Sequence, residues 1–344
     1  MVRNQVLWIT TIFTAVVLFL VGPVTRADKD DCTSVSIVPA AYDVIVVGAG
    51  PAGLQGALTL GRSLLKTLVI DAGKPRNWVV KDFHNFLGAD GDNPAKFRKK
   101  QRAHITKQYG DYVTFEDDTV TAISGSVGDF TVSTAKGQQY KAGRILLTVG
   151  VQEEVPAFPS SYSSQYYKSI FQCPFCHGFE IRHKKIGVVS PPVVEYPLMI
   201  KTWSSDVVIF TNGTKLAWAT NEALERLRKS SIKVIEGRIV DLVVSKADEL
   251  EAVVLEDGTK VERDVLYQKF RHFHQPLITD LKLELDQFMN VKVSSPKMET
   301  SVPGIYAAGD LSSSFHKVAM GVGAACQAAT FIAMDHRMSV EAML

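Results

Sequence analysis

Short apolar runs recur along the chain and alternate with longer segments of mixed polarity. Residues 44–47 and 67–70 are rich in valine, isoleucine and leucine, which suits buried strands of a parallel sheet. A glycine-rich turn and a helix-like segment lie between them. Residues 143–150 and 305–308 predict two further strands that lead into a glycine. This order predicts an α/β fold.

A second block with the same alternation spans about residues 155–275. Its strand-like and helix-like runs are residues 184–190, 206–213, 224–230 and 232–240. The strand predicted at 305–308 comes after this block. We therefore expect the first domain to be split, with a second domain inserted into it.

The turn after the first strand carries a glycine fingerprint. Gly48, Gly50 and Gly53 form G-x-G-x-x-G between a strand and a helix, and the next strand ends in Asp71. In a dinucleotide site, the first glycine allows the tight turn, the second lets the backbone approach a pyrophosphate, and the third allows close helix–strand packing. The helix N-terminus then attracts the phosphates, and Asp71 can accept hydrogen bonds from ribose hydroxyls.

The N-terminus predicts a secretory signal. Arg3 precedes an apolar run over residues 6–21, and a small residue, Ala27, provides a cleavage point. An uncleaved membrane anchor is the alternative, because the run is close to the lower length limit of a membrane span. We expect a protein of the secretory pathway, either secreted or in an endomembrane lumen.

Composition and cysteine number narrow the class further. With 344 residues, 46% hydrophobic residues and a net charge of +2, the chain is typical of a globular protein and gives no argument for a nucleic-acid partner. Cys32 lies in the predicted tail. Cys326 falls in a small-residue helix, where we expect an inert core thiol. Asn212 is in the one glycosylation sequon, NGT.

The remaining cysteines form a C-x-x-C-H motif, which fits three chemistries. A c-type haem would need a pocket and a second axial ligand. Zinc would need two more ligands, for which His272 and His274 are the only other histidines close together in the sequence. A redox disulfide needs only Cys173 and Cys176, with thiol pKa values lowered at the start of a helix. Motif context favours the disulfide.

Several motifs together resemble low-molecular-weight thioredoxin reductases: VVGAGPAG, LVIDAGKPRN, LLTVG, CPFCHG and TSVPGIYAAGD. The resemblance covers roughly residues 40–340. CPFCHGFE is most similar to the fungal dithiol oxidases of the gliotoxin-oxidase type, because reductases proper usually carry aspartate where this chain has His177. The resemblance implies two Rossmann-like three-layer α/β domains, a tightly bound FAD, a redox disulfide and a homodimer.

The resemblance also implies domain limits and cofactor contacts. The expected segments are a signal peptide over 1–27, the first part of the FAD-binding domain over 40–152, an inserted NAD(P)-domain-like segment over 153–275, and the second part of the FAD-binding domain over 276–344. Carried over by motif, the FAD contacts are Gly48, Gly50, Pro51, Ala52, Gly53, Asp71, Arg76, Asn77, His84, Val120, Gly150, Asp310, Lys317 and Val318.

The expected mechanism assigns a role to each residue of the motif. Cys176 faces the flavin, and the more exposed Cys173 exchanges with a thiol of the substrate. His177 is the candidate general base for the incoming thiol, with a structural role at the turn as the alternative. His316 is a weaker candidate for the same task. No metal is expected.

Two features that reductases of this family use for NADPH are missing. Residues 190–193 read Ser-Pro-Pro-Val where a glycine loop would stand, and proline offers no N–H to a phosphate. Residues 211–213 lack the basic cluster for a 2′-phosphate. We therefore predict an FAD-dependent dithiol oxidase with dioxygen as acceptor and hydrogen peroxide as product. The alternatives are an NADPH-dependent disulfide reductase and a non-catalytic flavin-binding protein.

Overall fold

The computed structural model describes residues 42–156 and 159–341. The predicted signal segment and Cys32 lie outside the described residues. A seven-stranded sheet has the spatial order β3-β2-β1-β6-β5-β4, with β17 also paired to β6. Its strands are β1 Tyr42–Val47, β2 Thr67–Asp71, β3 Val113–Asp117, β4 Val120–Ser126, β5 Asp129–Thr134, β6 Gln139–Leu147 and β17 Ile305–Ala307.

Strand β6 joins the two ends of the chain into this sheet. Its first residues pair with β5, in antiparallel register, whereas its last residues pair with β17 in parallel register. β1 runs parallel to β6 on the other side, and the second part of each strand, from Val44 and from Ala142, is buried. The C-terminal segment therefore completes a sheet that the N-terminal segment begins, as expected for a split domain.

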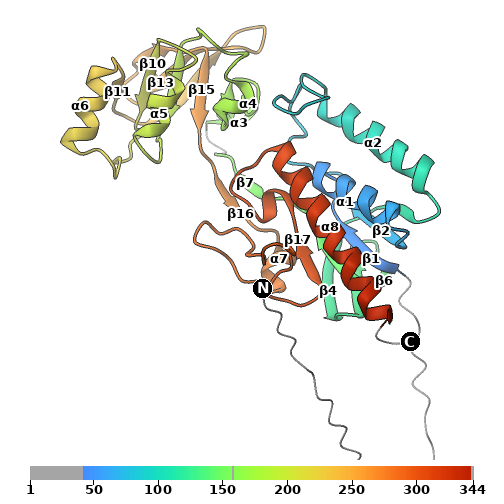
Figure 1. Ribbon diagram of the computed structural model, residues 1–344. Helices are drawn as coiled ribbons and strands as arrows, with labels where there is room; N and C mark the ends of the chain where they lie inside the picture. The colour runs from blue at the N-terminus through green and yellow to red at the C-terminus, as the bar shows by residue number, and fades with distance from the viewer. Residues whose placement is uncertain (1–41, 157–158, 342–344) are drawn as a thin grey trace, which may run out of the picture. The chain divides into compact units, whose positions relative to one another are not determined.

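Two helices made of small residues cover one face of this sheet. α1 (Pro51–Arg62) follows the glycine fingerprint, and α8 (Val318–Glu341) lies along it, as Figure 1 shows. Glycine and alanine residues on both helices allow the two helix backbones to approach closely. The buried residues of α8 are Gly321, Ala325, Ala328, Ala329, Ile332 and Ala333. By length and composition alone α8 could cross a membrane. Its buried face against α1 explains that composition as helix packing.

Cys326 corrects one expectation. Its helix packs as expected, but the thiol itself is free and exposed. The buried positions of α8 recur at 321, 325, 328–329 and 332–333, which is the spacing of one helix face. Residue 326 lies at the edge of this face, where its sulfur is 3.8 Å from Thr59 Oγ1 of α1. The prediction that this thiol lies in the core is therefore wrong.

The remaining elements of the first domain are α2 (Pro94–Tyr109), α7 (Pro276–Asp280) and the short helix η1 (Gly309–Leu311). α7 contributes Leu277 and Ile278 to the apolar core on the second face of the sheet. The sheet is thus covered on both faces.

The inserted segment builds a second, all-parallel sheet in the order β11-β10-β9-β15-β8. Its strands are β8 Ile170–Phe171, β9 Ile186–Val189, β10 Val207–Phe210, β11 Lys233–Ile235 and β15 Val265–Gln268. The helices of this segment are α3 Ser160–Ser164, α4 Pro174–His177, α5 Glu195–Ile200 and α6 Asn221–Lys229. The predicted alternation of strands and helices is confirmed here.

Two smaller sheets complete the fold. β12 (Ile239–Val244), β13 (Leu250–Leu255) and β14 (Lys260–Glu262) form an antiparallel sheet, which the sequence pattern did not predict. β7 (Gln152–Glu154) and β16 (Arg271–Phe273) pair antiparallel where the chain enters and leaves the inserted segment. The expected domain limits at 152 and 275 fall within or next to this β7–β16 ribbon.

Candidate active site

The glycine fingerprint has the backbone geometry that a dinucleotide requires. Gly48 has φ +98°, and a Cβ there would lie 2.8 Å from the carbonyl oxygen of Thr148. A Cβ on Gly53 would lie 1.8 Å from the carbonyl oxygen of Gly48. A Cβ on Gly50 would meet no heavy atom within 4 Å, so this position faces open space. Two glycines are thus needed for packing, and the third leaves room for a ligand.

The start of α1 adds favourable electrostatics. Gly50 is the N-cap with extended backbone, Pro51 occupies the first turn, and no acidic residue stands in that turn. Free N–H groups and the positive end of the helix dipole therefore face the cradle. The Asp71 carboxylate accepts a hydrogen bond of 2.9 Å from the N–H of Ala49, which holds it beside the loop. These residues fit FAD, whose diphosphate and ribose need such donors and acceptors.

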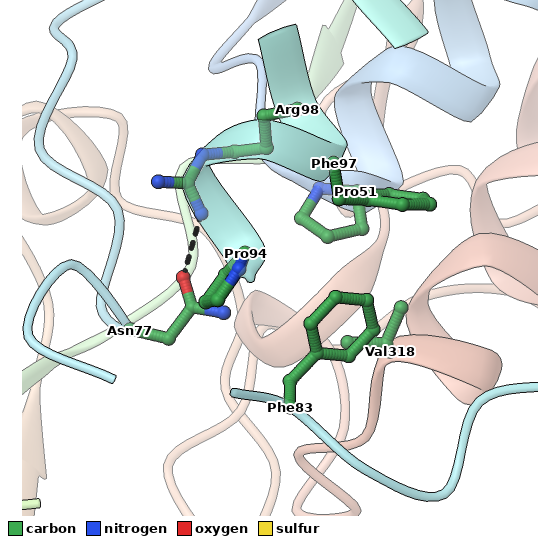
Figure 2. A pocket seen from close by; sticks show the side chains of 7 residues that line it. All are labelled: Pro51, Asn77, Phe83, Pro94, Phe97, Arg98 and Val318. Atoms are coloured by element: carbon green, nitrogen blue, oxygen red, sulfur yellow. Dashed lines mark hydrogen bonds between the residues drawn. The ribbon is translucent and has the colours of Figure 1, made fainter. Parts of the chain in front are cut away.

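Three of the predicted FAD contacts come together in the pocket of Figure 2. Pro51, Asn77 and Val318 line it from α1, the loop after β2 and the start of α8. The other lining residues, which sequence reasoning missed, are Phe83, Pro94, Phe97 and Arg98. Most of these belong to α2, which has no motif that could have identified them.

Arg76 lies in an ion-pair network. Its Nε is 2.5 Å from Glu153 Oε1, and its Nη1 is 2.8 Å from Asp310 Oδ2. Burial opposes the charge of Arg76, but Tyr167 and the two carboxylates together raise its pKa. Burial would raise the pKa of Glu153, yet His272 and Arg76 hold it below its usual value. Two predicted contacts, Arg76 and Asp310, therefore bind each other through this network.

Gln172 extends this network to the cysteine motif. Its side-chain N–H donates to Glu153 Oε1, and its side-chain oxygen accepts from the Phe270 N–H at 3.2 Å. Its carbonyl oxygen accepts from the Tyr196 hydroxyl at 2.7 Å. The residue before Cys173 is therefore fixed by three hydrogen bonds. A single glutamate in a strand gave no signal of this role in the sequence.

The other predicted FAD contacts lie in different surroundings. Gly150 has φ +66° with open space around it, while Val120 is buried in the core of the first sheet. Lys317 Nζ lies 4.8 Å from the ring centre of Phe175, within the cysteine motif. Ala52 packs under Gly309, whose Cβ position is 3.1 Å from the alanine methyl. Their contacts with FAD stay predictions.

The cysteine motif forms a disulfide. Cys173 and Cys176 are bonded, with Cα atoms 5.3 Å apart, and Cys173 is the N-cap of the short helix α4. Both residues are partly exposed. Because each sulfur is bonded to the other, neither is free to ligate zinc or to attach haem. No cluster of three or more metal-ligating side chains occurs within residues 42–156 and 159–341.

A cavity of about 240 Å³ opens beside Cys176. Three aromatic side chains line it, Phe175, Phe179 and Trp203, and the first two are more than half exposed. Its polar side is made of His84, Asn85, Asp90 and Glu180. His84 Nδ1 lies 3.6 Å from Glu180 Oε1 and 3.7 Å from Asp90 Oδ1. The predicted FAD contact His84 thus lies in the same cavity as the disulfide.

His177 lies directly behind the disulfide. Its ring stacks on Phe171, with centres 4.4 Å apart, and meets His84 edge-on at 6.2 Å. Its Nδ1 is buried without a hydrogen-bond partner among the described residues. Burial, followed by the charge that His84 can carry, lowers the pKa of His177 to about 4. The imidazole is therefore neutral at pH 7.

His316, the weaker candidate, does not lie with His177 but with the ion-pair network. Its ring centre is 4.7 Å from that of His272, and burial lowers its pKa to about 4.

In the second sheet, the loop after β9 is closed by side chains of the chain itself. Ser190 has φ +41°, and the Trp218 indole donates to the Pro191 carbonyl oxygen at 2.7 Å. Glu195 stands in the first turn of α5, where it pairs with Arg226 at 2.8 Å. Proline, an acidic first turn and a covering indole are all unfavourable for a nucleotide phosphate.

Comparisons with known proteins agree with this architecture. The family model described as pyridine nucleotide-disulphide oxidoreductase matches residues 42–330. The probable thioredoxin reductase of Arthroderma benhamiae is 30% identical over 302 residues, covering 78% of this chain and 74% of that protein. Thioredoxin reductase tcpT of Claviceps purpurea is 31% identical over 278 residues, covering 78% and 86% respectively.

Two solved structures are similar over most of their length. The putative thioredoxin reductase TrxB of Bacillus anthracis has a TM-score of 0.79 at 30% identity and covers 87% of this chain and 99% of that one. HlmI has a TM-score of 0.78 at 30% identity, with coverages of 88% and 93%. Both likenesses extend over the first sheet and the inserted segment.

Proposed function

Since the chain belongs to the family of pyridine nucleotide-disulphide oxidoreductases, we propose that it is an FAD-dependent dithiol oxidase. Family membership makes it a flavin-dependent disulfide oxidoreductase with FAD as the cofactor. The proposed finer activity converts a dithiol and dioxygen into a disulfide and hydrogen peroxide. The reaction balances, because the dithiol loses two electrons and two protons, and dioxygen gains the same two electrons and two protons to form hydrogen peroxide.

The observation that carries this proposal is the closed loop after β9. A reductase of this family needs a second nucleotide site, yet here Pro191 and Trp218 bond to each other over the loop. Glu195 places a negative charge at the start of the next helix. These features argue against NADPH as electron donor, and the electrons must then come from a thiol.

The relatives named thioredoxin reductases favour the second candidate, an NADPH-dependent disulfide reductase. That candidate requires a phosphate to displace the Trp218 indole and to approach Glu195. Glu195 in the first turn of α5 weakens the attraction of that helix start for a phosphate, and Arg226 is already engaged by this carboxylate. We therefore prefer the oxidase.

The cysteine pair performs the thiol chemistry. One thiolate of the substrate attacks the Cys173–Cys176 bond and forms a mixed disulfide with one of these sulfurs, which releases the other as a thiolate. The second substrate thiol then displaces the protein sulfur, so that the product leaves as a disulfide and the pair is left reduced. FAD, when bound, would supply the two-electron redox chemistry that links the reduced cysteines to dioxygen.

The cavity beside Cys176 supports a substrate of small size. Phe175, Phe179 and Trp203 supply apolar contacts. His177 follows Cys176 in the sequence and does not line the cavity; its neutral imidazole is the proposed acceptor of the thiol proton. The motif assigns attack by the substrate to Cys173, whereas Cys176 is the cysteine that lines the cavity. The assignment of the attacked sulfur to Cys173 therefore stays a prediction. A homodimer in the secretory pathway is part of the same proposal, on the resemblance and the N-terminal sequence.

The experiment is an anaerobic titration of the purified yellow protein with dithiothreitol, followed by air. We expect the flavin absorbance near its visible maximum to fall with dithiothreitol and to return with air, with one hydrogen peroxide per disulfide. NADPH without thiol should cause no change. Rapid bleaching by micromolar NADPH would instead establish the reductase.

Variants complete the test. Cys173→Ser and Cys176→Ser should each abolish turnover while FAD stays bound, because exchange needs both sulfurs. Cys326→Ser is the matched control: this cysteine is free and exposed on α8, so turnover should be retained. If no dithiol reduced the wild-type flavin, the chain would be a flavin-binding protein without this activity.

A further inference from the structure

Arg98 differs from the other arginine of the cofactor region in having no acidic partner. Arg76 is held by Glu153 and Asp310. Arg98, on the second turn of α2, donates from Nη1 to the amide oxygen of Asn77 at 2.9 Å, as Figure 2 shows. No carboxylate oxygen of the described residues lies within ion-pair distance of it. An amide oxygen orients a guanidinium without neutralising it.

The position of Arg98 relates it to the cofactor. It lines the same pocket as Pro51, the first residue of the helix that follows the glycine fingerprint, and Asn77 and Val318 line that pocket too. Arg98, Phe83, Pro94 and Phe97 line one side of this pocket, and all four belong to the first domain. Arg98 therefore lies beside the start of α1, whose N-terminus faces the space that the fingerprint reserves for a dinucleotide.

The surroundings of Arg98 only partly compensate the burial of its charge. Burial lowers the pKa of Arg98, and the charge of Asp71 only partly opposes this effect. Asp71 itself is engaged by the N–H of Ala49. α2 contains no acidic residue, so its own sequence offers no compensation either. A half-buried, oriented and unpaired guanidinium is typical of an anion-binding group.

We propose that Arg98 binds the diphosphate of FAD. A guanidinium can donate two parallel hydrogen bonds to phosphate oxygens, and Nη1 remains shared with Asn77 while Nε and Nη2 are available. The α1 N-terminus would bind the diphosphate from one side and Arg98 from the other. This assignment depends on FAD as cofactor and not on the oxidase activity.

The test measures how fast FAD leaves the full-length holoenzyme. After dilution, the fluorescence of released flavin gives the dissociation rate for the wild type, Arg98→Gln and Arg98→Lys. A charge-assisted contact predicts that Arg98→Gln releases FAD about 10- to 100-fold faster in 50 mM salt. The ratio should shrink in 1 M salt, because salt screens the charge interaction that the wild type alone retains. Arg98→Lys should be intermediate, since it keeps the charge but not the fork.

Arg102→Gln is the matched control. Arg102 lies one turn further along α2 and pairs with Asp117 at 2.5 Å, outside the pocket. This variant should release FAD at the wild-type rate. Thermal unfolding of each variant with excess FAD shows whether it folds. If Arg98→Gln does not fold, Arg98→Lys gives the decisive rate.

Three results would overturn the assignment. In the first, Arg98→Gln releases FAD within twofold of the wild type. In the second, Arg102→Gln releases it as fast as Arg98→Gln. In the third, Arg98→Lys releases FAD as fast as Arg98→Gln, so that the charge makes no difference. If Arg98→Gln cannot be measured, an Arg98→Lys rate equal to the wild-type rate would exclude a contact that depends on the guanidinium fork.

Discussion

Two buried histidines should make the folded protein sensitive to mild acid. Burial lowers the pKa of His177 and of His316 from 6.5 to about 4. The unfolded chain therefore binds more protons than the folded chain between these pH values. The stability that the neutral imidazoles contribute is fully present above pH 6.5 and is lost as the pH falls towards 4.

The size of the effect follows from the shift. Between pH 7 and pH 5, each histidine with these two pKa values costs ~2 kcal/mol of unfolding free energy, or roughly 4 kcal/mol for the pair. That is a large part of the stability of an ordinary domain. Carboxylates that lose their partners add to the loss below pH 5, so the test uses the difference between variants.

Urea unfolding of the holoenzyme at pH 7, 6 and 5, with excess FAD, measures this difference. His177→Phe keeps a ring against Phe171 and removes the titrating group, so its loss of stability between pH 7 and pH 5 should be smaller than the wild-type loss by ~2 kcal/mol. His104→Gln, at an exposed position of α2, should leave the loss unchanged. An unaltered loss in His177→Phe would refute the reasoning.

Three further predictions follow from the same structure. Gly53→Ala should lower the melting temperature of the apoprotein and reduce its unfolding free energy by ~1–3 kcal/mol or more, because the new Cβ would meet a backbone oxygen. Gly50→Ala should leave the melting temperature unchanged and weaken FAD binding in a fluorescence titration. His177→Ala should slow the thiol-dependent reduction of the flavin about 10²- to 10⁴-fold in stopped-flow traces if the imidazole is the general base, and an unchanged rate would make it structural. Expression in a eukaryotic secretory host should remove about 27 residues, as N-terminal sequencing would show, and an intact N-terminus in the membrane fraction would indicate an anchor.

The sequence predicted the glycine fingerprint and four strands of the first sheet, β1, β2, β6 and β17, because local pattern decides both. It did not predict β3, β4 and β5. Runs of β-branched residues become central parallel strands. Gly48 and Gly53 each answer a local steric demand, whereas Gly50 leaves room for a ligand. The antiparallel sheet β12-β13-β14 was missed, since an acidic residue interrupts the apolar run of β12 and of β13, at Asp241 and Glu251. Cys326 was placed wrongly because a helix rich in small residues does not reveal which face lies outward.

The missed site residues have a different cause. Glu153 meets Arg76 across 77 positions of the chain, and Trp218 meets Pro191 across 27. Such pairs arise from tertiary structure, so no spacing in the sequence announces them. Arg98 belongs to a helix with many basic residues, and only its contact with Asn77 separates it from solvated neighbours.

The pairing of β6 with β17 has a consequence for biosynthesis. The cofactor cradle needs α1 from the beginning of the chain and η1, with Asp310 and the start of α8, from its end. A ribosome has therefore made nearly the whole chain before the FAD site can close, whereas the inserted segment can fold earlier as a unit. FAD loading is thus a late step that follows synthesis, and a chain that stops before residue 305 lacks the strand that completes the first sheet.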